Sequence, residues 1–323
     1  MGEWVILLLL MIDATVRVAT PLVLAALAGL FAERSGVVDI GLEGKMLGAA
    51  FAAGAVAAVL GSPWLGLAAA IVVAIALSMV HGLACITLNG NQVVSGMALN
   101  ILMAGLAPTL AYAWFSEGGQ TPLLGPGQRF SPIVLPFADT LSQVPVIGAI
   151  YGRISGHNVL VYIAALSVPV VAFVLYRTRF GLRLRAVGEN PQAVDTAGIS
   201  VAALRYRALL CTGVLCGLSG AYLSTAHGAA FVRDMTAGKG YLALAALIFG
   251  KWRPLPTLLA CLLFAFTDAL QARLQGAILP VFGQVPVQAI QALPYVLTVL
   301  LLAGFVGRAM APKAIGVPYV KER

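Results

Sequence analysis

Long runs of Leu, Val, Ile and Ala, interrupted by Gly and Pro, fill most of this 323-residue chain. The runs do not alternate apolar and polar residues with the period of two that membrane β-strands require. Runs of about 20 apolar residues are long enough to cross the hydrocarbon core of a bilayer as helices. The pattern therefore predicts an all-α polytopic membrane protein, organised as a single transmembrane domain over residues 1–323.

The predicted spans share long stretches without charge. They cover residues 14–31, 42–60, 64–88, 93–115, 159–176, 208–224, 255–274 and 287–306. Residues 1–12 are apolar but too short to cross a bilayer alone, so we interpret them as an interfacial anchor that runs into the first span. With a shorter apolar helix at 241–249, the expected count is eight to ten transmembrane helices, and the side of the N-terminus is left open.

Two interruptions differ from ordinary connections. Residues 33–46, ERSGVVDIGLEGKM, insert five charged residues and three glycines between two spans. They are either a cytoplasmic turn or a broken helix whose backbone lines a cavity. Residues 241–249 give roughly 13 Å of helix, less than half a bilayer, and glycines flank them on both sides. A Gly-rich break before a small-residue helix thus occurs in each half of the chain, a weak echo that points to a translocation site.

The longest polar stretch of the second half is residues 177–207, which contain six arginines and two acids. Asn190 is a good N-cap, Pro191 is the favoured first helical residue, and Gly198 is a good helix end. These signals predict a helix over 191–197, which is too short to be stable alone and needs support from neighbouring spans or a partner. The alternative is a plain basic loop that orients the chain.

The charge distribution indicates orientation rather than nucleic-acid binding. The net charge of +8 comes mostly from basic residues in 177–207, at 251–253 and in the C-terminal tail, which we place on the cytoplasmic side. The Pro- and Gly-rich loop 116–157 is then external, as are 225–239 and 276–286. The arginines can also contact anionic membrane lipids. We expect no removable signal peptide, and the 35 glycines indicate close helix packing.

The chain offers little for catalysis. Its cysteines lie in apolar runs and its histidines are scattered without metal-ligand spacing, so we expect no catalytic residue and no metal site. These residues are Cys85, Cys211, Cys216, Cys261, His81, His157 and His227. No Walker A sequence is present, so energy for transport must come from a separate ATPase. A secondary transporter would need ionisable residues deep in the spans, where Asp268 is nearly alone, and an intramembrane enzyme is the least favoured class.

Four stretches resemble the signature blocks of ABC-importer permeases of the branched-chain amino acid and ribose group. They are ERSGVVDIGLEGKM, NQVVSGMALNILMAGL, FGLRLRAVGENPQAVDTAGI and GKGYLALAALIFGKW. The resemblance covers about residues 14–308 and is nearest to the nucleoside and simple-sugar permeases that work with basic membrane lipoprotein-type binding proteins. It implies a bacterial cytoplasmic-membrane subunit that imports a small polar solute. A nucleoside is the first expectation, with a simple sugar or a branched-chain amino acid as alternatives.

The resemblance also implies partners. They are an ABC ATPase that binds ATP-Mg, a second paralogous permease in a heterodimer, and an extracytoplasmic binding lipoprotein or periplasmic protein. No cofactor is expected on this chain itself. The resemblance further implies that the short helix is the cytoplasmic coupling helix that sits in a groove of the ATPase. The matching residues are Arg185, Gly188, Glu189, Asn190, Pro191, Ala193, Gly198 and Ile199.

A nucleoside combines polar groups with a flat ring, so its pathway should mix amides and hydroxyls with aromatic or apolar walls. Residues 33–46 are called here the first break. Family members often have INIGLEG where this chain has VDIGLEG, so Asp39 adds a charge to the first break. The candidate pathway residues are Asp39, Glu43, Ser95, Asn100, Phe231 and Tyr241.

Overall fold

The structure, a computed structural model, describes residues 3–134, 151, 155–274, 278–279, 283–284, 292, 296, 299 and 310–321. The described chain is almost entirely helical. In chain order its helices are α1 (Glu3–Arg34), α2 (Leu42–Leu60), α3 (Pro63–Gly82), α4 (Gln92–Phe115), α7 (Val159–Arg177), α8 (Arg179–Glu189), α9 (Pro191–Thr196), α10 (Val201–Tyr222), α11 (Lys239–Phe249) and α12 (Pro254–Leu274). Two-residue strands β1 (Ile278–Leu279) and β2 (Gly283–Gln284) pair antiparallel.

Seven helical segments of the described chain are long and apolar enough to cross a membrane, and α11 is the predicted shorter helix. This confirms the all-α polytopic class. Helices α3 and α10 each continue into a π-helical turn, η1 (Leu83–Thr87) and η2 (Leu223–His227). The span predicted at 287–306 lies outside the described residues, apart from single positions, as does the external loop over most of 135–154.

Two predicted boundaries are wrong. The first helix covers residues 3–34 and not 14–31, so the apolar N-terminal segment is continuous with the span into which it was predicted to run, and Pro21 is accommodated inside it. Helix α10 begins at Val201 and not at 208, because the hydroxyl of Ser200 accepts a hydrogen bond from Ala203 N at 3.3 Å and caps the helix. Arg205 therefore lies within a membrane-spanning helix, whereas the apolar pattern of the sequence places it in the preceding polar stretch.

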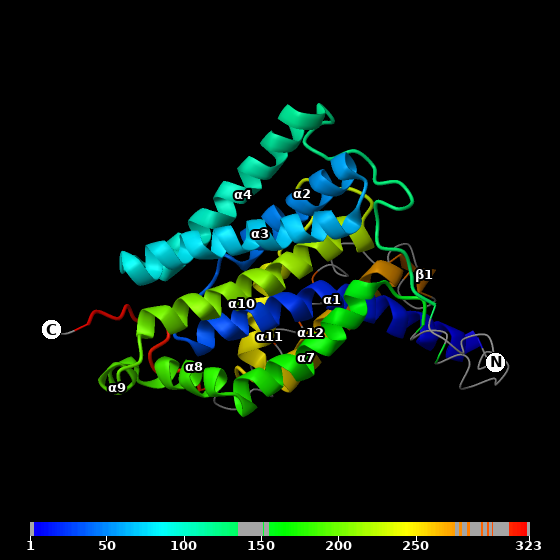
Figure 1. Ribbon diagram of the computed structural model, residues 1–323. Coiled ribbons are helices and arrows are strands. Elements are labelled where there is room, and N and C mark those ends of the chain that lie inside the picture. Colours follow the sequence, from blue (N-terminus) through cyan, green and yellow to red (C-terminus); the bar gives the residue numbers. More distant parts are fainter. Residues whose placement is uncertain are drawn as a thin grey trace.

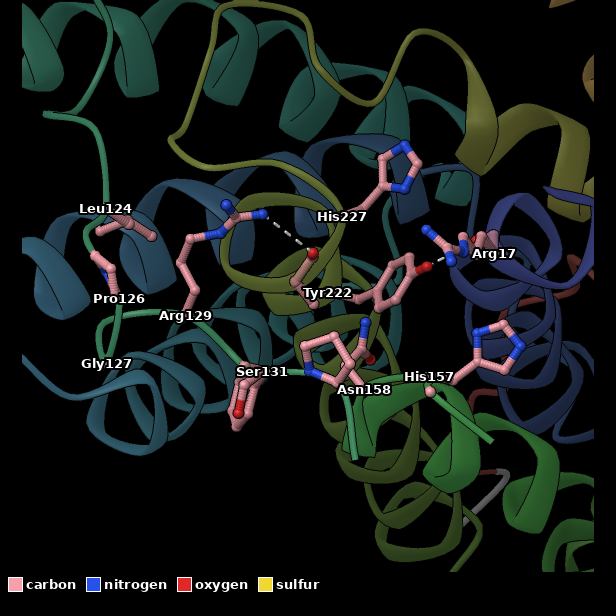
Figure 2. A pocket seen from close by; sticks show the side chains of 14 residues that line it. Arg17, Leu124, Pro126, Gly127, Arg129, Ser131, His157, Asn158, Tyr222 and His227 are labelled. Atoms are coloured by element: carbon pink, nitrogen blue, oxygen red, sulfur yellow. Dashed lines mark hydrogen bonds between the residues drawn. The ribbon is translucent and has the colours of Figure 1, made fainter. Parts of the chain in front are cut away.

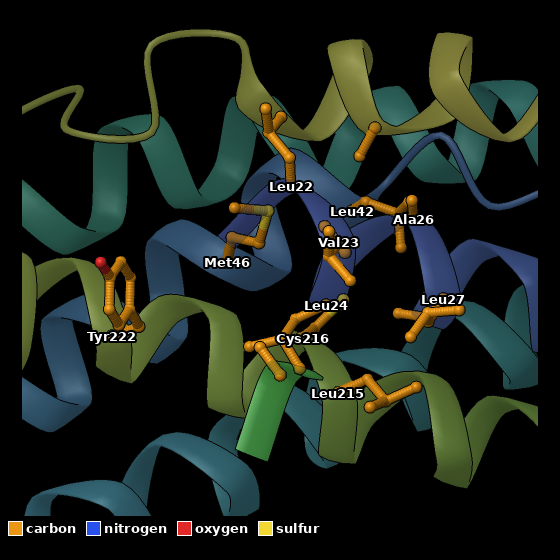
Figure 3. Close-up of a cluster of buried hydrophobic side chains, with 14 of the residues drawn as sticks. Leu22, Val23, Leu24, Ala26, Leu27, Leu42, Met46, Leu215, Cys216 and Tyr222 are labelled. Atoms are coloured by element: carbon orange, nitrogen blue, oxygen red, sulfur yellow. The ribbon is translucent and has the colours of Figure 1, made fainter. Parts of the chain in front are cut away.

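The core forms where α1, α2 and α10 meet (Figure 3). Leu24 and Leu27 of α1, Met46 of α2 and Cys216 of α10 are all almost completely buried there. Burial of such side chains holds helices together in a bilayer mainly through packing contacts. Helix α4 instead leans away from the bundle (Figure 1) and leaves a wide apolar face exposed.

Small residues set the distance between α10 and α3. A β-carbon at Gly213 would lie 2.7 Å from Cα of Ile75, and one at Gly217 would lie 2.6 Å from Cα of Ile71. Real β-carbons do not approach so closely, so the two helices pack backbone against backbone, as the glycine content indicates.

The connections gather at two opposite ends of the bundle. At one end, called here the α9 end, lie α8, α9, the segment 34–41, the turn 250–253 and the tail 311–321 (Figure 1). At the far end, the segment 121–130 is tied to 225–231 by backbone hydrogen bonds, including Leu124 N to Ala229 O at 2.7 Å. The basic segments predicted to share the cytoplasmic side therefore lie together.

Candidate functional site

The two interruptions of the sequence meet in the structure. The carboxylate of Glu43, in the first turn of α2, accepts hydrogen bonds from Gly238 N at 2.7 Å and Gly240 N at 2.5 Å, where α11 begins. A β-carbon at Gly240 would lie 2.5 Å from Glu43 N. Unsatisfied N–H groups and the helix dipole favour a carboxylate at a helix N-terminus. The start of α2 and the start of the half-length helix α11 thus form one junction.

Asn100 of α4 completes this junction. Its amide oxygen accepts from Gly44 N at 2.8 Å, and its amide nitrogen donates to Ile40 O at 2.9 Å and to the Tyr241 hydroxyl at 2.8 Å. The amide is nearly buried, whereas Tyr241 is 41% exposed. The junction therefore presents a phenol at the surface beside α4, backed by an amide and a carboxylate.

A buried charged cluster lies behind the junction, in the break that precedes α2. Asp39 forms an ion pair with Lys45, and both side chains are fully buried. His81 of α3 lies 3.9 Å from the Asp39 carboxylate, with one ring nitrogen 3.0 Å from Val38 O and the other 3.0 Å from the Ser95 hydroxyl. Buried charges are tolerated when they are paired. The burial favours a broken helix over an ordinary turn for residues 33–46.

The six candidate pathway residues are therefore not equivalent. Glu43, Asn100 and Tyr241 meet at the junction, and His81 connects Ser95 to Asp39. Phe231 is fully buried elsewhere, with its ring centroid 5.4 Å from that of Phe51. Lys45 and His81 are partners of Asp39 that could not be predicted from the sequence. His81 lies 42 positions from Asp39, and Lys45, although only six positions away, meets Asp39 because of how the break folds.

The predicted coupling segment has the expected caps. The Asn190 side chain accepts from Ala193 N at 3.1 Å, Pro191 is the first residue of α9, and Gly198 has the positive φ of +76° typical of a helix end. The helix ends at Thr196, one residue before the predicted end. Val194 is its buried residue and packs with Val187, Val201 and Leu204, so most of the α9 surface is free for a partner.

Helix α8, which precedes α9, was not predicted from the sequence. Its N-cap is Thr178, whose hydroxyl accepts from Gly181 N at 3.1 Å. Phe180, Leu184 and Val187 lie at helical spacing, a signal that the surrounding arginines hide. The Arg185 guanidinium lies over the Tyr176 ring of α7, 5.0 Å from its centroid. Gly188 allows α8 to touch the end of α1, because a β-carbon there would lie 2.3 Å from Arg34 O.

Residues 11–308 match the profile of the family described as branched-chain amino acid transport system permease component. The chain belongs to this family. The permease is 38% identical to NupQ of Bacillus subtilis, a guanosine ABC transporter permease protein, over 98% of each chain. It is 38% identical to NupC of Lactococcus lactis, a nucleoside ABC transporter permease protein, over 94% of this chain and 95% of NupC. It is also 39% identical to TsgC13 of Haloferax volcanii, provisionally named a glucose ABC transporter permease, over 87% of this chain and 82% of TsgC13.

Membership fixes the general role. The permease is a multi-pass protein of the bacterial cytoplasmic membrane and a transport component, whereas ATP is hydrolysed on separate subunits. An ATPase and a binding protein are therefore its partners. Among the described residues, no group of three His, Cys, Asp or Glu side chains is placed to hold a metal ion.

The permease also has a cavity of about 580 Å³ at its far end, which the sequence analysis did not foresee (Figure 2). It lies between α1, α10 and the segments around 129 and 157. Tyr222 and His227 stack at its wall with ring centroids 5.9 Å apart, and Arg129 donates to Ala226 O at 3.5 Å. The Tyr222 hydroxyl donates to Arg17 O at 2.9 Å. Basic and apolar side chains both line the cavity, which is separate from the junction.

Proposed function

We propose that this permease carries a nucleoside across the membrane after receiving it from an extracytoplasmic binding lipoprotein or periplasmic protein. The observation that carries the proposal is the 38% identity, over nearly the whole chain, to two permeases named for guanosine and for nucleosides. The junction chemistry agrees with it. Tyr241 presents its phenol at the surface, held by the buried amide of Asn100 beside the carboxylate of Glu43, and an aromatic hydroxyl suits a solute with hydroxyls and a flat polar ring.

The driving step is assigned to α9. ATP-Mg binds to the partner ATPase, this chain itself needs no cofactor, and closure of the ATPase subunits displaces α9 as a lever. The permease subunits then alternate between inward- and outward-facing arrangements by rigid-body movement. The support is the exposed surface of α9 together with its firm base, because Val194 anchors the helix to α8 and α10.

The working pore is a heterodimer of this chain and a second, paralogous permease. The half-exposed Tyr241 and the exposed Met97 of α4 lie side by side, with the tyrosine hydroxyl 3.9 Å from the methionine sulfur. A solute pathway between the two permeases would follow the surface at Tyr241 and Met97, where polar and apolar groups meet. Asp39 and Ser95 then support this surface from behind through His81, whereas Phe231 is buried against Phe51 and lines no part of it.

The substrate test uses the complete transporter. The purified binding protein is titrated with guanosine, adenosine, ribose and glucose, and the reconstituted complex is assayed for uptake of labelled guanosine and labelled glucose. We expect tight binding of nucleosides and ATP-dependent guanosine uptake. Binding and uptake of a free sugar without nucleoside binding would contradict the proposal and favour the glucose alternative, for which the 39% identity to TsgC13 is the specific observation.

A further inference from the structure

The C-terminal tail, residues 311–321, lies between the coupling segment and the first break. Ala314 N donates to Gly188 O at 2.9 Å, at the end of α8, and Gly316 N donates to Gly36 O at 3.0 Å, just after α1. Three residues of tail therefore span from one segment to the other. The two backbone hydrogen bonds fix the register of the tail between them.

Glycines make this close approach possible. A β-carbon at Gly36, which has φ of +85°, would lie 2.9 Å from Ala314 O, and one at Gly188 would lie 2.3 Å from Arg34 O. Neither position has room for a side chain. The end of α1, the end of α8 and the tail thus contact one another through their backbones, without flexible side chains between them.

Arg205 holds the same region from the α10 side. It is 1% exposed, and it donates from Nε to Ser35 O at 3.2 Å and from Nη2 to Val317 O at 3.2 Å. A guanidinium is a rigid fork of donors, and its burial is tolerated only when those donors are satisfied. Arg205 therefore ties the tail to the first break, one residue away from the backbone bond at Gly36.

The last part of the tail reaches α9 itself. Tyr319 packs against the cluster of Val187, Val194 and Val201 that supports α9. Lys321 lies 3.5 Å from the Asp195 carboxylate of α9, an exposed pair that contributes little energy but marks the contact. The tail thus touches α8, the segment 35–36 and α9 in succession.

We propose that residues 311–321 form a strap that transmits displacement of α9 to the first break, and through it to the junction at Glu43. From Gly36 the chain runs within a few residues to Asp39 and then to Glu43, which is bonded to the start of α11. A rigid connection at Gly36 therefore moves the junction when α8 and α9 move. This inference rests on the proposed function, in which α9 receives the force.

The first experiment removes the strap by ending the chain after Met310. The truncated permease is reconstituted with its ATPase, second permease and binding protein, and both ATP hydrolysis and solute uptake are measured. We expect assembly and binding-protein-stimulated ATP hydrolysis to persist within about twofold, while uptake per ATP falls by roughly tenfold, a typical size for a lost coupling. Unchanged uptake per ATP would overturn the proposal.

If the truncated chain fails to assemble, a point variant tests the contact between the tail and α8 instead. Ala314→Pro removes the N–H that donates to Gly188 O and keeps the rest of the tail. Its matched control is Ala314→Gly, which keeps the N–H at the same position. Uptake per ATP should fall for Ala314→Pro and remain normal for Ala314→Gly, and equal coupling in the two variants would also overturn the strap.

Deletion of residues 190–198 is assayed in parallel. If that deletion leaves transport normal, the role of α9 fails and the strap has nothing to transmit. If the deletion uncouples transport but the tail variants do not, the strap alone fails and the role of α9 stands.

Discussion

The first break, residues 33–46, contains an ion pair between Asp39 and Lys45, and both side chains are completely buried. Removing one member of a buried pair leaves an uncompensated charge and costs about 3–5 kcal/mol, whereas replacing both members is often nearly neutral. We therefore expect Lys45→Met alone to lower the melting temperature of the detergent-solubilised permease markedly. The double variant Lys45→Met with Asp39→Asn should recover most of the loss.

The control is Lys313→Met, which removes a charge of the same type at an exposed position. Its melting temperature should match that of the unmodified chain. If the double variant melts as low as Lys45→Met alone, the loss comes from the geometry of Lys45 and not from an unpaired Asp39.

Tyr241 is the junction residue that a solute can reach. Its hydroxyl accepts from Asn100, and its ring is partly exposed. Tyr241→Phe removes the hydroxyl and leaves the Asn100 amide one partner short, a change worth about 0.5–1.5 kcal/mol and so roughly two- to tenfold in uptake. Initial uptake rates, measured at several concentrations of loaded binding protein, check this expectation.

Tyr112→Phe is the matched control, because Tyr112 lies on α4 and is 63% exposed. It should transport normally. Equal effects of the two variants would show that loss of a phenol, and not loss of the junction contact, changes the rate.

At the scale of elements, the cap of α9 gives a graded test of the coupling segment. Asn190→Ala removes the acceptor for Ala193 N and destabilises the helix by about 0.5–2 kcal/mol, while Asn190→Asp keeps an acceptor. We expect Asn190→Ala to lower uptake per ATP, and Asn190→Asp to preserve it. Glu189→Arg, next to the cap, should leave the permease inserted but uncoupled. Identical coupling in all three variants would contradict the role of this segment.

Elements whose signals are local could be predicted from the sequence. Asn190, Pro191 and Gly198 act within one turn, so α9 was predicted to within a residue. Helix α8 was missed because its arginines conceal an apolar stripe, and the start of α10 was misplaced because Ser200 was not recognised as a cap. At the site, the two breaks were predicted separately. The bonds from Gly238 and Gly240 to Glu43 join residues about 200 positions apart, and no local pattern encodes such a pairing.

At the scale of the whole molecule, the two ends of the bundle have different chemistry. The α9 end combines α8, α9, the first break and the tail, whereas the far end carries the segment around 121–130 and the cavity. A lever at one end and solute entry at the other require that the ends face opposite sides of the membrane. The basic residues predict that the α9 end is cytoplasmic.

Single introduced cysteines test this orientation directly. Thr196→Cys places a thiol on the exposed surface of α9, and Glu117→Cys places one at the exposed far end, just after α4. Three of the four native cysteines are buried and Cys211 is half-buried, so background labelling should be low. A membrane-impermeant maleimide should label Thr196→Cys only in inside-out vesicles and Glu117→Cys only in right-side-out vesicles. The reverse pattern would place α9 beyond the reach of a cytoplasmic ATPase, and the lever and the strap would both have to be abandoned.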